Sequence, residues 1–257
     1  MEILLLIGLL GLVCGFLSGV LGIGGGIIMA PLLLYIPPLF GFERLGMHTV
    51  AGLTIIQGLV ACISGAVAHK KFNFVSGRLT LCMGGSIFVA ALVGGAGASY
   101  VSNRMLLLVF GSLAILAAFL MFIDQDGEME NPDVGELDFS CWRAVAAAGS
   151  VGLLGGLVGQ GGSFILIPLM TSFVKIPTRI ALGSNLAIVL LSTAAAFLGK
   201  ALTGQIEWLM ALPVALTVMP AAYLGGHVSQ KLPVIILRRI LALIIALAAI
   251  RICFSLV

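Results

Sequence analysis

The residues best suited to chemistry in this chain are small polar side chains that lie beside two glycine-rich breaks. The breaks fall in related stretches, residues 15–33 and 152–170, which are 137 residues apart and identical at nine of 19 aligned positions. Glycine weakens a helix, and a broken backbone at membrane depth survives only when protein or a wet cavity surrounds it. Matched breaks in the two halves of a membrane protein therefore predict the binding site of a transporter.

A helix is expected to begin at each break, at Gly26 in the first half and at Ser163 in the second. The first turn of a helix has unpaired N–H groups and a partial positive charge, so two such starts facing each other would bind an anion without a lysine. Hydroxyls and amides nearby suit sulfonate or carboxylate oxygens. The predicted substrate-binding residues are Ser18, Gly24, Gly25, Gly26, Thr54, Gln57, Gln160, Gly161, Gly162, Ser163, Ser184 and Asn185, with Thr49 and Ser192 close by.

Three further residues are candidates for a gate or a proton carrier: His48, His69 and Lys200. His69 and Lys200 end equivalent spans of the two halves. The simpler interpretation is that both side chains snorkel to the membrane interface, and the alternative is that they form a gate that attracts anions. No acidic residue lies well inside a predicted span, so a proton would have to travel on a histidine or on the substrate, or transport is not coupled to protons.

Composition identifies an integral membrane protein. Of the 257 residues, 61% are hydrophobic and only 9% are charged, whereas a soluble domain has about 25% charged residues. The apolar segments are long, which favours helices over the short alternating strands of a barrel. The chain is thus expected to be an all-α polytopic protein in a lipid bilayer, with no nucleic acid as a partner.

Enzymatic and metal-binding motifs are lacking in the sequence. There is no HExxH motif, no plausible nucleophile elbow and no pair of acids within the spans, so we expect no enzyme, no cofactor and no metal site. The five cysteines are scattered and show no CxxC spacing. They are predicted to be buried thiols outside any disulfide framework.

The chain divides into a first repeat at 1–123, an acidic polar linker at 124–141 and a second repeat at 142–257. Seven of the ten acids lie within 124–140. Each repeat is expected to contain a glycine-broken helical hairpin, which either re-enters the membrane or spans it twice, and three transmembrane helices. The first hairpin should have helices ending near 21 and 35. The expected spans are 49–69, 79–100 and 105–123 in the first half, and 181–200, 209–228 and 235–256 after the hairpin at 142–174.

Charge placement favours an inverted relation between the halves. If each hairpin returns to its starting side, nine of the 13 Lys and Arg residues fall on one side and four on the other. If each broken segment crosses once, the division is seven against six. The positive-inside rule expects a clear bias, so we predict two inverted-topology repeats, with both termini outside and the linker in the cytoplasm.

The paired glycine motifs at 15–33 and 152–170 resemble those of the TauE/SafE sulfite exporter family, also called TSUP. The segments Gly183-Ser184-Asn185 and 204–208, Gly-Gln-Ile-Glu-Trp, share this resemblance, which covers nearly the full length. It implies transport of small sulfur-containing anions, such as sulfite or C2/C3 organosulfonates, across the bacterial inner membrane. The first half departs from the family pattern, with Gly52-Leu53-Thr54 where members often have a Gly-Thr-Ser type triplet, so the second half is the better candidate for most substrate contacts.

The function expected from these features is export of such an anion by alternating access. A passive anion channel or facilitator is the first alternative, and a non-transporting membrane scaffold is the second. The glycine-rich faces could support a homodimer, or they could pack within one chain. Neither the substrate nor the direction of transport follows from the sequence.

Overall fold

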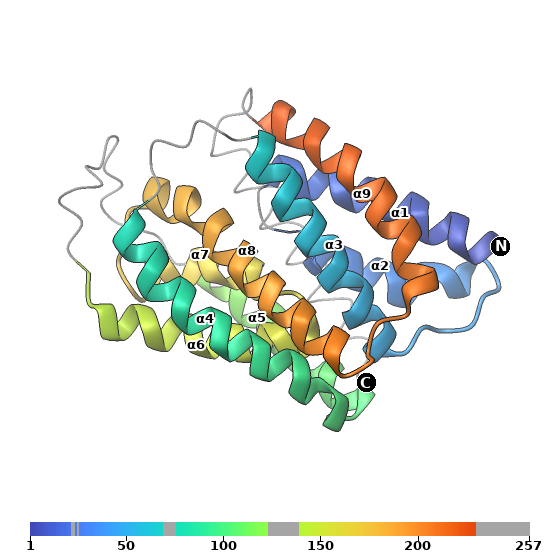
Figure 1. Ribbon diagram of the computed structural model, residues 1–257, viewed down its shortest axis with the longest axis horizontal. Helices are drawn as coiled ribbons and strands as arrows, with labels where there is room; N and C mark the ends of the chain where they lie inside the picture. The colour runs from blue at the N-terminus through green and yellow to red at the C-terminus, as the bar shows by residue number, and fades with distance from the viewer. Residues whose placement is uncertain (22–23, 25, 69–75, 123–138, 230–257) are drawn as a thin grey trace.

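The computed structural model describes residues 1–257 except 22–23, 25, 69–75, 123–138 and 230–257. The described residues form α-helices and one short 3-10 helix, without strands, as the composition predicts (Figure 1). Residues 124–138 of the acidic linker and the last expected span, 235–256, lie outside the described residues, whereas Cys141 at the end of the linker begins a helix. The helices are α1 Glu2–Leu21, α2 Gly26–Leu39, α3 Met47–Ala68, α4 Gly77–Gly97, η1 Ala98–Tyr100, α5 Asn103–Phe122, α6 Cys141–Val158, α7 Ser163–Ser172, α8 Thr178–Leu202 and α9 Trp208–Ser229.

Each long apolar run is broken at its glycine cluster, and the new helix starts at the predicted residue, Gly26 or Ser163. The end of α2 differs from the expectation, because this helix continues beyond Tyr35 to Leu39 and includes Pro37 and Pro38. Proline lacks an N–H group but keeps its carbonyl as an acceptor. Phe40 N–H donates to the Pro37 carbonyl at 3.0 Å, which closes the last turn despite the prolines.

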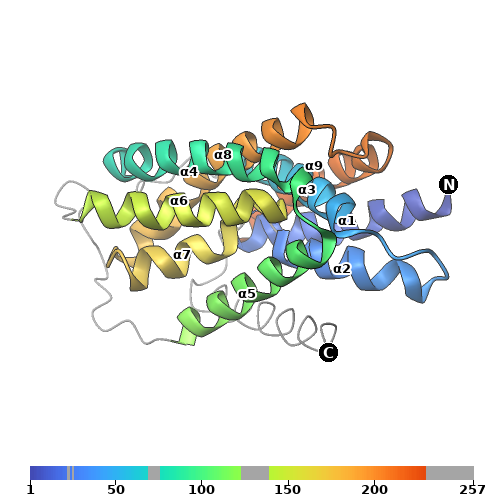
Figure 2. The same cartoon turned by 90° about the horizontal axis from the view of Figure 1, so that it is seen from below.

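The first helix of each half packs against a helix of the other half. Helix α1 of the first half packs on α9 of the second, and α6 of the second half packs on α4 of the first. Glycines allow both close approaches in the same way, since a side chain at Gly94 would meet the Leu153 carbonyl and one at Gly225 would meet the Phe16 carbonyl. In Figures 1 and 2, α1 runs away from the end marked N, whereas α6 runs towards it.

Helices α3 and α8 join the two halves. They contact each other, and α3 also packs on α9 while α8 packs on α4. Each of them therefore contacts helices from its own half and from the other half. This arrangement holds the glycine breaks against the middle of both helices.

The outer surface of the helices is apolar. Large side chains such as Leu9 of α1, Val89 of α4, Phe119 of α5 and Leu216 of α9 are each at least 60% exposed. Six described helices are long and apolar enough to cross a membrane: α1, α3, α4, α6, α8 and α9. An apolar surface of this extent fits a lipid environment, so the protein is a multi-pass membrane protein.

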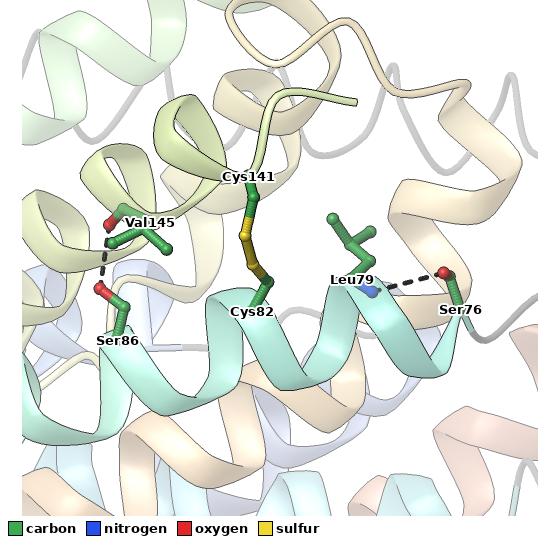
Figure 3. The surroundings of a disulfide bond; sticks show 6 residues. All are labelled: Ser76, Leu79, Cys82, Ser86, Cys141 and Val145. Carbon is green, nitrogen blue, oxygen red and sulfur yellow. Dashed lines mark hydrogen bonds between the residues drawn. A yellow bond between two sulfur atoms is a disulfide. The ribbon is translucent and has the colours of Figure 1, made fainter. Parts of the chain in front are cut away.

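One expectation about the cysteines is wrong. Cys82 of α4 and Cys141 at the start of α6 form a disulfide, with their Cα atoms 6.5 Å apart (Figure 3). They are 59 residues apart in sequence, and only the close packing of α4 on α6 brings them together, so no spacing pattern could reveal the pair. A second contact at this interface is the hydrogen bond that the Ser86 hydroxyl donates to the Val145 carbonyl at 2.9 Å. Cys14 and Cys62 are free and buried, as predicted.

Candidate functional site

The two glycine breaks have related backbone geometry. Gly24 has φ +69° and Gly161, its aligned partner, has φ +59°. L-residues with a side chain rarely adopt this left-handed region, and glycine does so without steric cost. In the second break the chain leaves α6 through Gly159, also left-handed, and starts α7 after Gly162. No side chain caps the first turn of α7.

The two breaks lie directly against each other. A Cβ atom built on Gly24 would lie 3.5 Å from the Ser163 hydroxyl oxygen, and one built on Gly26 would lie 3.1 Å from Cγ of Gln160. The start of α2 and the start of α7 are therefore adjacent, with polar side chains of the second break facing glycines of the first. This is the juxtaposition that the sequence predicts.

The breaks meet halfway along α3 and α8. A Cβ atom on Gly58 of α3 would lie 3.4 Å from the Gly24 carbonyl oxygen and 3.4 Å from Cγ2 of Thr193 on α8. Thr193 also packs on Gly161, and a side-chain hydrogen bond links it to Cys62. Cys62 of α3 and Thr193 of α8 therefore lie together beside the breaks, where a helix of each half meets the other.

Several buried polar side chains around the breaks lack a hydrogen-bond partner among the residues that the structure describes. Each of them is at least nine-tenths buried. Burying a polar group without a partner costs free energy, and such groups in a native protein usually bind water, an ion or a ligand. The group comprises Ser18 of α1, Gln57 of α3, Gln160 and Ser163 of the second break, and Ser192 of α8. The Ser192 hydroxyl oxygen lies 3.5 Å from the Cβ position of Gly161.

Two predicted site residues have hydrogen bonds within the fold. The Thr54 hydroxyl donates to the Gly159 carbonyl at 3.0 Å and so holds the second break against α3. The Ser184 hydroxyl oxygen accepts the N–H of Ser76 at 3.1 Å, at the start of α4. Thr54 is therefore at the site but supports the backbone, whereas Ser184 anchors a neighbouring helix.

The remaining predicted residues have mixed outcomes. Asn185 is fully buried beside Ser184. His48 lies at the start of α3, one turn before the residues that contact the breaks, and its N–H donates to the Asn103 side chain at 3.0 Å. No hydrogen bond or close contact joins His48 to the described residues of the breaks. Gly25 and His69 lie outside the described residues.

Lys200 lies inside the protein and not at the membrane interface. Of the two interpretations, snorkelling to the interface is wrong, because the side chain is fully buried. Its ammonium group donates to the Leu157 carbonyl at 3.1 Å and to Oε1 of Gln205 at 3.4 Å. Leu157 lies in the last turn of α6, whose carbonyls have no partner within the helix, so the lysine caps this helix end.

The site that the structure describes is made of neutral donors and one nearby cation. The acids among the described residues are Glu2, Glu43 and Glu207, and all three are exposed. In the same part of the chain, no three His, Cys, Asp or Glu residues come together as metal ligands. Hydroxyls, amides and helix starts are groups that bind anions.

Sequence reasoning missed Cys62 and Thr193 as members of the site. Both are small side chains on predicted spans, and each lies eight residues after a predicted site residue, Thr54 or Asn185. Eight residues are about two helical turns, so these positions share a helix face. That spacing was the available signal.

These features define a multi-pass helical membrane protein with a buried polar site at two facing helix breaks. The profile of the family described as Sulfite exporter TauE/SafE matches residues 7–252. The chain therefore belongs to this family of membrane transporters.

Relatives extend over nearly the whole chain. It is 25% identical to the "Probable membrane transporter protein YdhB" of Bacillus subtilis (strain 168), over 99% of this chain and 100% of the relative. It is 24% identical to the "Probable membrane transporter protein YunE" of the same organism, over 87% and 86%. A "Probable membrane transporter protein" of Xylella fastidiosa (strain Temecula1 / ATCC 700964) is 26% identical, over 97% and 94%. No solved structure matches the chain.

Proposed function

We propose that this protein exports small sulfur-containing anions, such as sulfite or C2/C3 organosulfonates, across the bacterial inner membrane by alternating access. The observation that carries the proposal is the set of unpartnered buried donors where the two glycine breaks meet. Gln160 and Ser163 supply an amide and a hydroxyl beside the start of α7. Sulfite and sulfonate oxygens are acceptors that such donors satisfy.

In this proposal the anion loses water and gains fixed hydrogen bonds. The N–H groups of the first turns of α2 and α7 balance its charge, because a helix start carries a partial positive charge. The side chains of Gln57, Gln160, Ser163 and Ser192 orient its oxygens, while Thr54 keeps the second break in place. Burial between α3 and α8 excludes water and strengthens each of these interactions.

Alternating access requires two halves that can exchange roles. We propose two inverted repeats, 1–123 and 142–257, joined by the linker at 124–141. The opposite directions of α1 and α6 and the exchanged packing of α1 on α9 and α6 on α4 support this relation. Related repeats around a midplane site are the common architecture of secondary transporters.

The orientation proposed from the positive-inside rule puts both termini outside and the linker in the cytoplasm. The Cys82–Cys141 disulfide lies at the end of the linker, and disulfides are rare in the cytosol. The distribution of positive charges thus places the linker in the cytoplasm, whereas the disulfide favours the opposite side of the membrane. Modification of cysteines introduced into the linker, with a membrane-impermeant reagent on intact cells, decides between them.

A passive facilitator is the second candidate. It is favoured by the exposed position of all three described acids, Glu2, Glu43 and Glu207, since buried carboxylates are common proton carriers. Carrier and facilitator differ in their response to a proton gradient and in counterflow. Of the three gate or proton candidates, His48 and Lys200 lie in the part of the chain that the structure describes.

The test is flux in proteoliposomes loaded in turn with sulfite, thiosulfate, sulfoacetate, sulfolactate and sulfate, with and without a pH gradient. Saturable movement that responds to the gradient is the expected result for a coupled exporter. Saturable movement that ignores the gradient and shows no counterflow would identify a facilitator. If folded protein moves none of these anions, the proposed function is wrong.

A further inference from the structure

Lys200 is a buried cation whose charge no described residue balances. Its side chain is fully buried, and both of its hydrogen-bond acceptors, the Leu157 carbonyl and the Gln205 amide oxygen, are neutral. Glu207 is the acid closest in sequence, and it is exposed. Across the described part of the chain, no carboxylate forms an ion pair with this lysine. A buried charge without a counter-charge is costly, and in membrane proteins such residues usually serve function.

The groups around Lys200 hold it in place. The Gln205 amide nitrogen donates to the Gly95 carbonyl at 2.9 Å and also bonds the Thr203 hydroxyl. Gln205 N–H donates back to the Lys200 carbonyl at 3.0 Å. The glutamine is therefore fixed from three sides, and its amide oxygen is aimed at the ammonium group. The ammonium position follows from this network rather than from free rotation of a long side chain.

The Lys200 ammonium also lies close to the candidate site. Leu157, which it bonds, lies in the last turn of α6 and precedes Gln160 of the second break by three residues. Gln160 carries an amide whose nitrogen and oxygen are both buried and unpartnered, and its side chain faces Gly26. The charge and the unpartnered donors thus belong to the same end of α6. Attraction between opposite charges that are buried in a protein is screened much less than between exposed charges.

We propose that the Lys200 ammonium is the fixed positive charge that balances the anion bound at the glycine breaks. The proposal rests on the proposed function and adds a charged specificity residue to a site otherwise made of neutral donors. Lys200 then favours anions over neutral molecules of the same shape. Without substrate, the ammonium group keeps its position through its hydrogen bonds to the Leu157 carbonyl and the Gln205 amide oxygen.

A purely structural role predicts different behaviour. If Lys200 only caps α6, its replacement should lower stability and leave anion affinity unchanged in the protein that folds. Two variants separate these roles. Lys200→Gln removes the charge and keeps a donor for the Leu157 carbonyl. Gln205→Glu keeps the lysine and places a carboxylate where the amide oxygen lies, 3.4 Å from the ammonium nitrogen, which gives the lysine an internal counter-ion.

The experiment measures thermal unfolding of the purified full-length protein in detergent against increasing sulfite, thiosulfate or sulfoacetate at constant ionic strength. Lys175→Gln is the matched control, because it removes the same charge from an exposed loop position. Wild type and Lys175→Gln should show saturable stabilisation with similar half-saturation. Lys200→Gln and Gln205→Glu should each weaken binding by about tenfold or more.

The outcomes distinguish the two proposals. If wild-type protein binds an anion and either folded neutralising variant binds it with wild-type half-saturation, the role of Lys200 is refuted while the proposed function stands. If wild-type protein shows no saturable stabilisation by any of the three anions, the proposed function fails and this inference fails with it. Should Lys200→Gln not fold, Gln205→Glu alone decides, because it retains the lysine.

Discussion

The two glycine breaks share a backbone plan but differ in their side chains. The first, Gly22-Ile23-Gly24-Gly25-Gly26, has no polar side chain, whereas the second, at 159–163, contains Gln160 and Ser163. Polar groups of the second break face glycines of the first, at Gly24 and Gly26. At the breaks themselves, the second thus supplies polar side chains and the first supplies space, so the two breaks are asymmetric although their sequences are related. The same substitution made in each break should therefore change stability and transport to different extents.

The largest effect is expected from adding a methyl group to the second break. A Cβ atom at Gly161 would lie 2.6 Å from Cγ2 of Thr193, in addition to the strain of a left-handed φ. We expect Gly161→Ala to lose about 2–4 kcal/mol of unfolding free energy and to abolish flux. Gly24→Ala shares the φ strain but meets only ordinary contacts at 3.5 Å, so it should lose about 1–2 kcal/mol. Denaturation in detergent and proteoliposome flux measure both, and equal losses would contradict the asymmetry.

Replacing the unpartnered amides should separate binding from stability. Gln160→Leu removes two unsatisfied buried atoms at similar volume, so stability should stay unchanged or rise by about 1 kcal/mol. The KM for the transported anion should rise about tenfold, because donors to its oxygens are lost. Gln57→Leu on α3 is the matched change in the first half, with a smaller rise in KM. A loss of stability in Gln160→Leu would mean that its amide has a structural partner.

A hydroxyl with a partner in the fold should behave in the opposite way. Ser184 accepts the N–H of Ser76 at 3.1 Å, so Ser184→Ala leaves a buried N–H unsatisfied and should cost about 1–2 kcal/mol. The KM of the surviving protein should not change. Thermal unfolding and flux kinetics measure the two quantities. A change in KM without a change in stability would show that Ser184 contacts the substrate.

The smallest effect on transport is expected from the disulfide. Cys82 and Cys141 join α4 to α6 far along the chain from the glycine breaks, so Cys82→Ser should leave KM unchanged. Labelling with a thiol-reactive polymer should add one more group per chain to the Cys82→Ser variant than to unreduced wild type, because Cys141 becomes free. An unreduced wild-type protein that already labels at both positions would show that the bond does not form.

Much of this arrangement could be predicted from sequence because its signals are local. Glycine clusters inside apolar runs marked the starts of α2 and α7, and apolar length marked α3 within two residues of its bounds, Met47–Ala68. The burial of Lys200 could not be predicted in this way. A lysine at the end of a span can reach the interface or turn inward, and here the outcome depends on a carbonyl 43 residues away.

The partners of Ser184 and Cys82 could not be predicted either, because both lie far away in the sequence. Ser184 bonds a residue 108 positions away, and Cys82 pairs across 59 positions. Such contacts depend on the register of packed helices, which periodicity does not specify. The asymmetry of the breaks was visible in the sequence as residue types, but its consequence, donors of one break facing glycines of the other, required the packed structure.

The central claim is that the two breaks together form one anion site. Its most direct test is calorimetric titration of the purified protein with the transported anion, in wild type, Gln160→Leu and Gln57→Leu. We predict one anion per chain, bound more weakly in both variants because the single site takes donors from both halves. Two independent anions per chain, or binding that neither variant weakens, would contradict the claim.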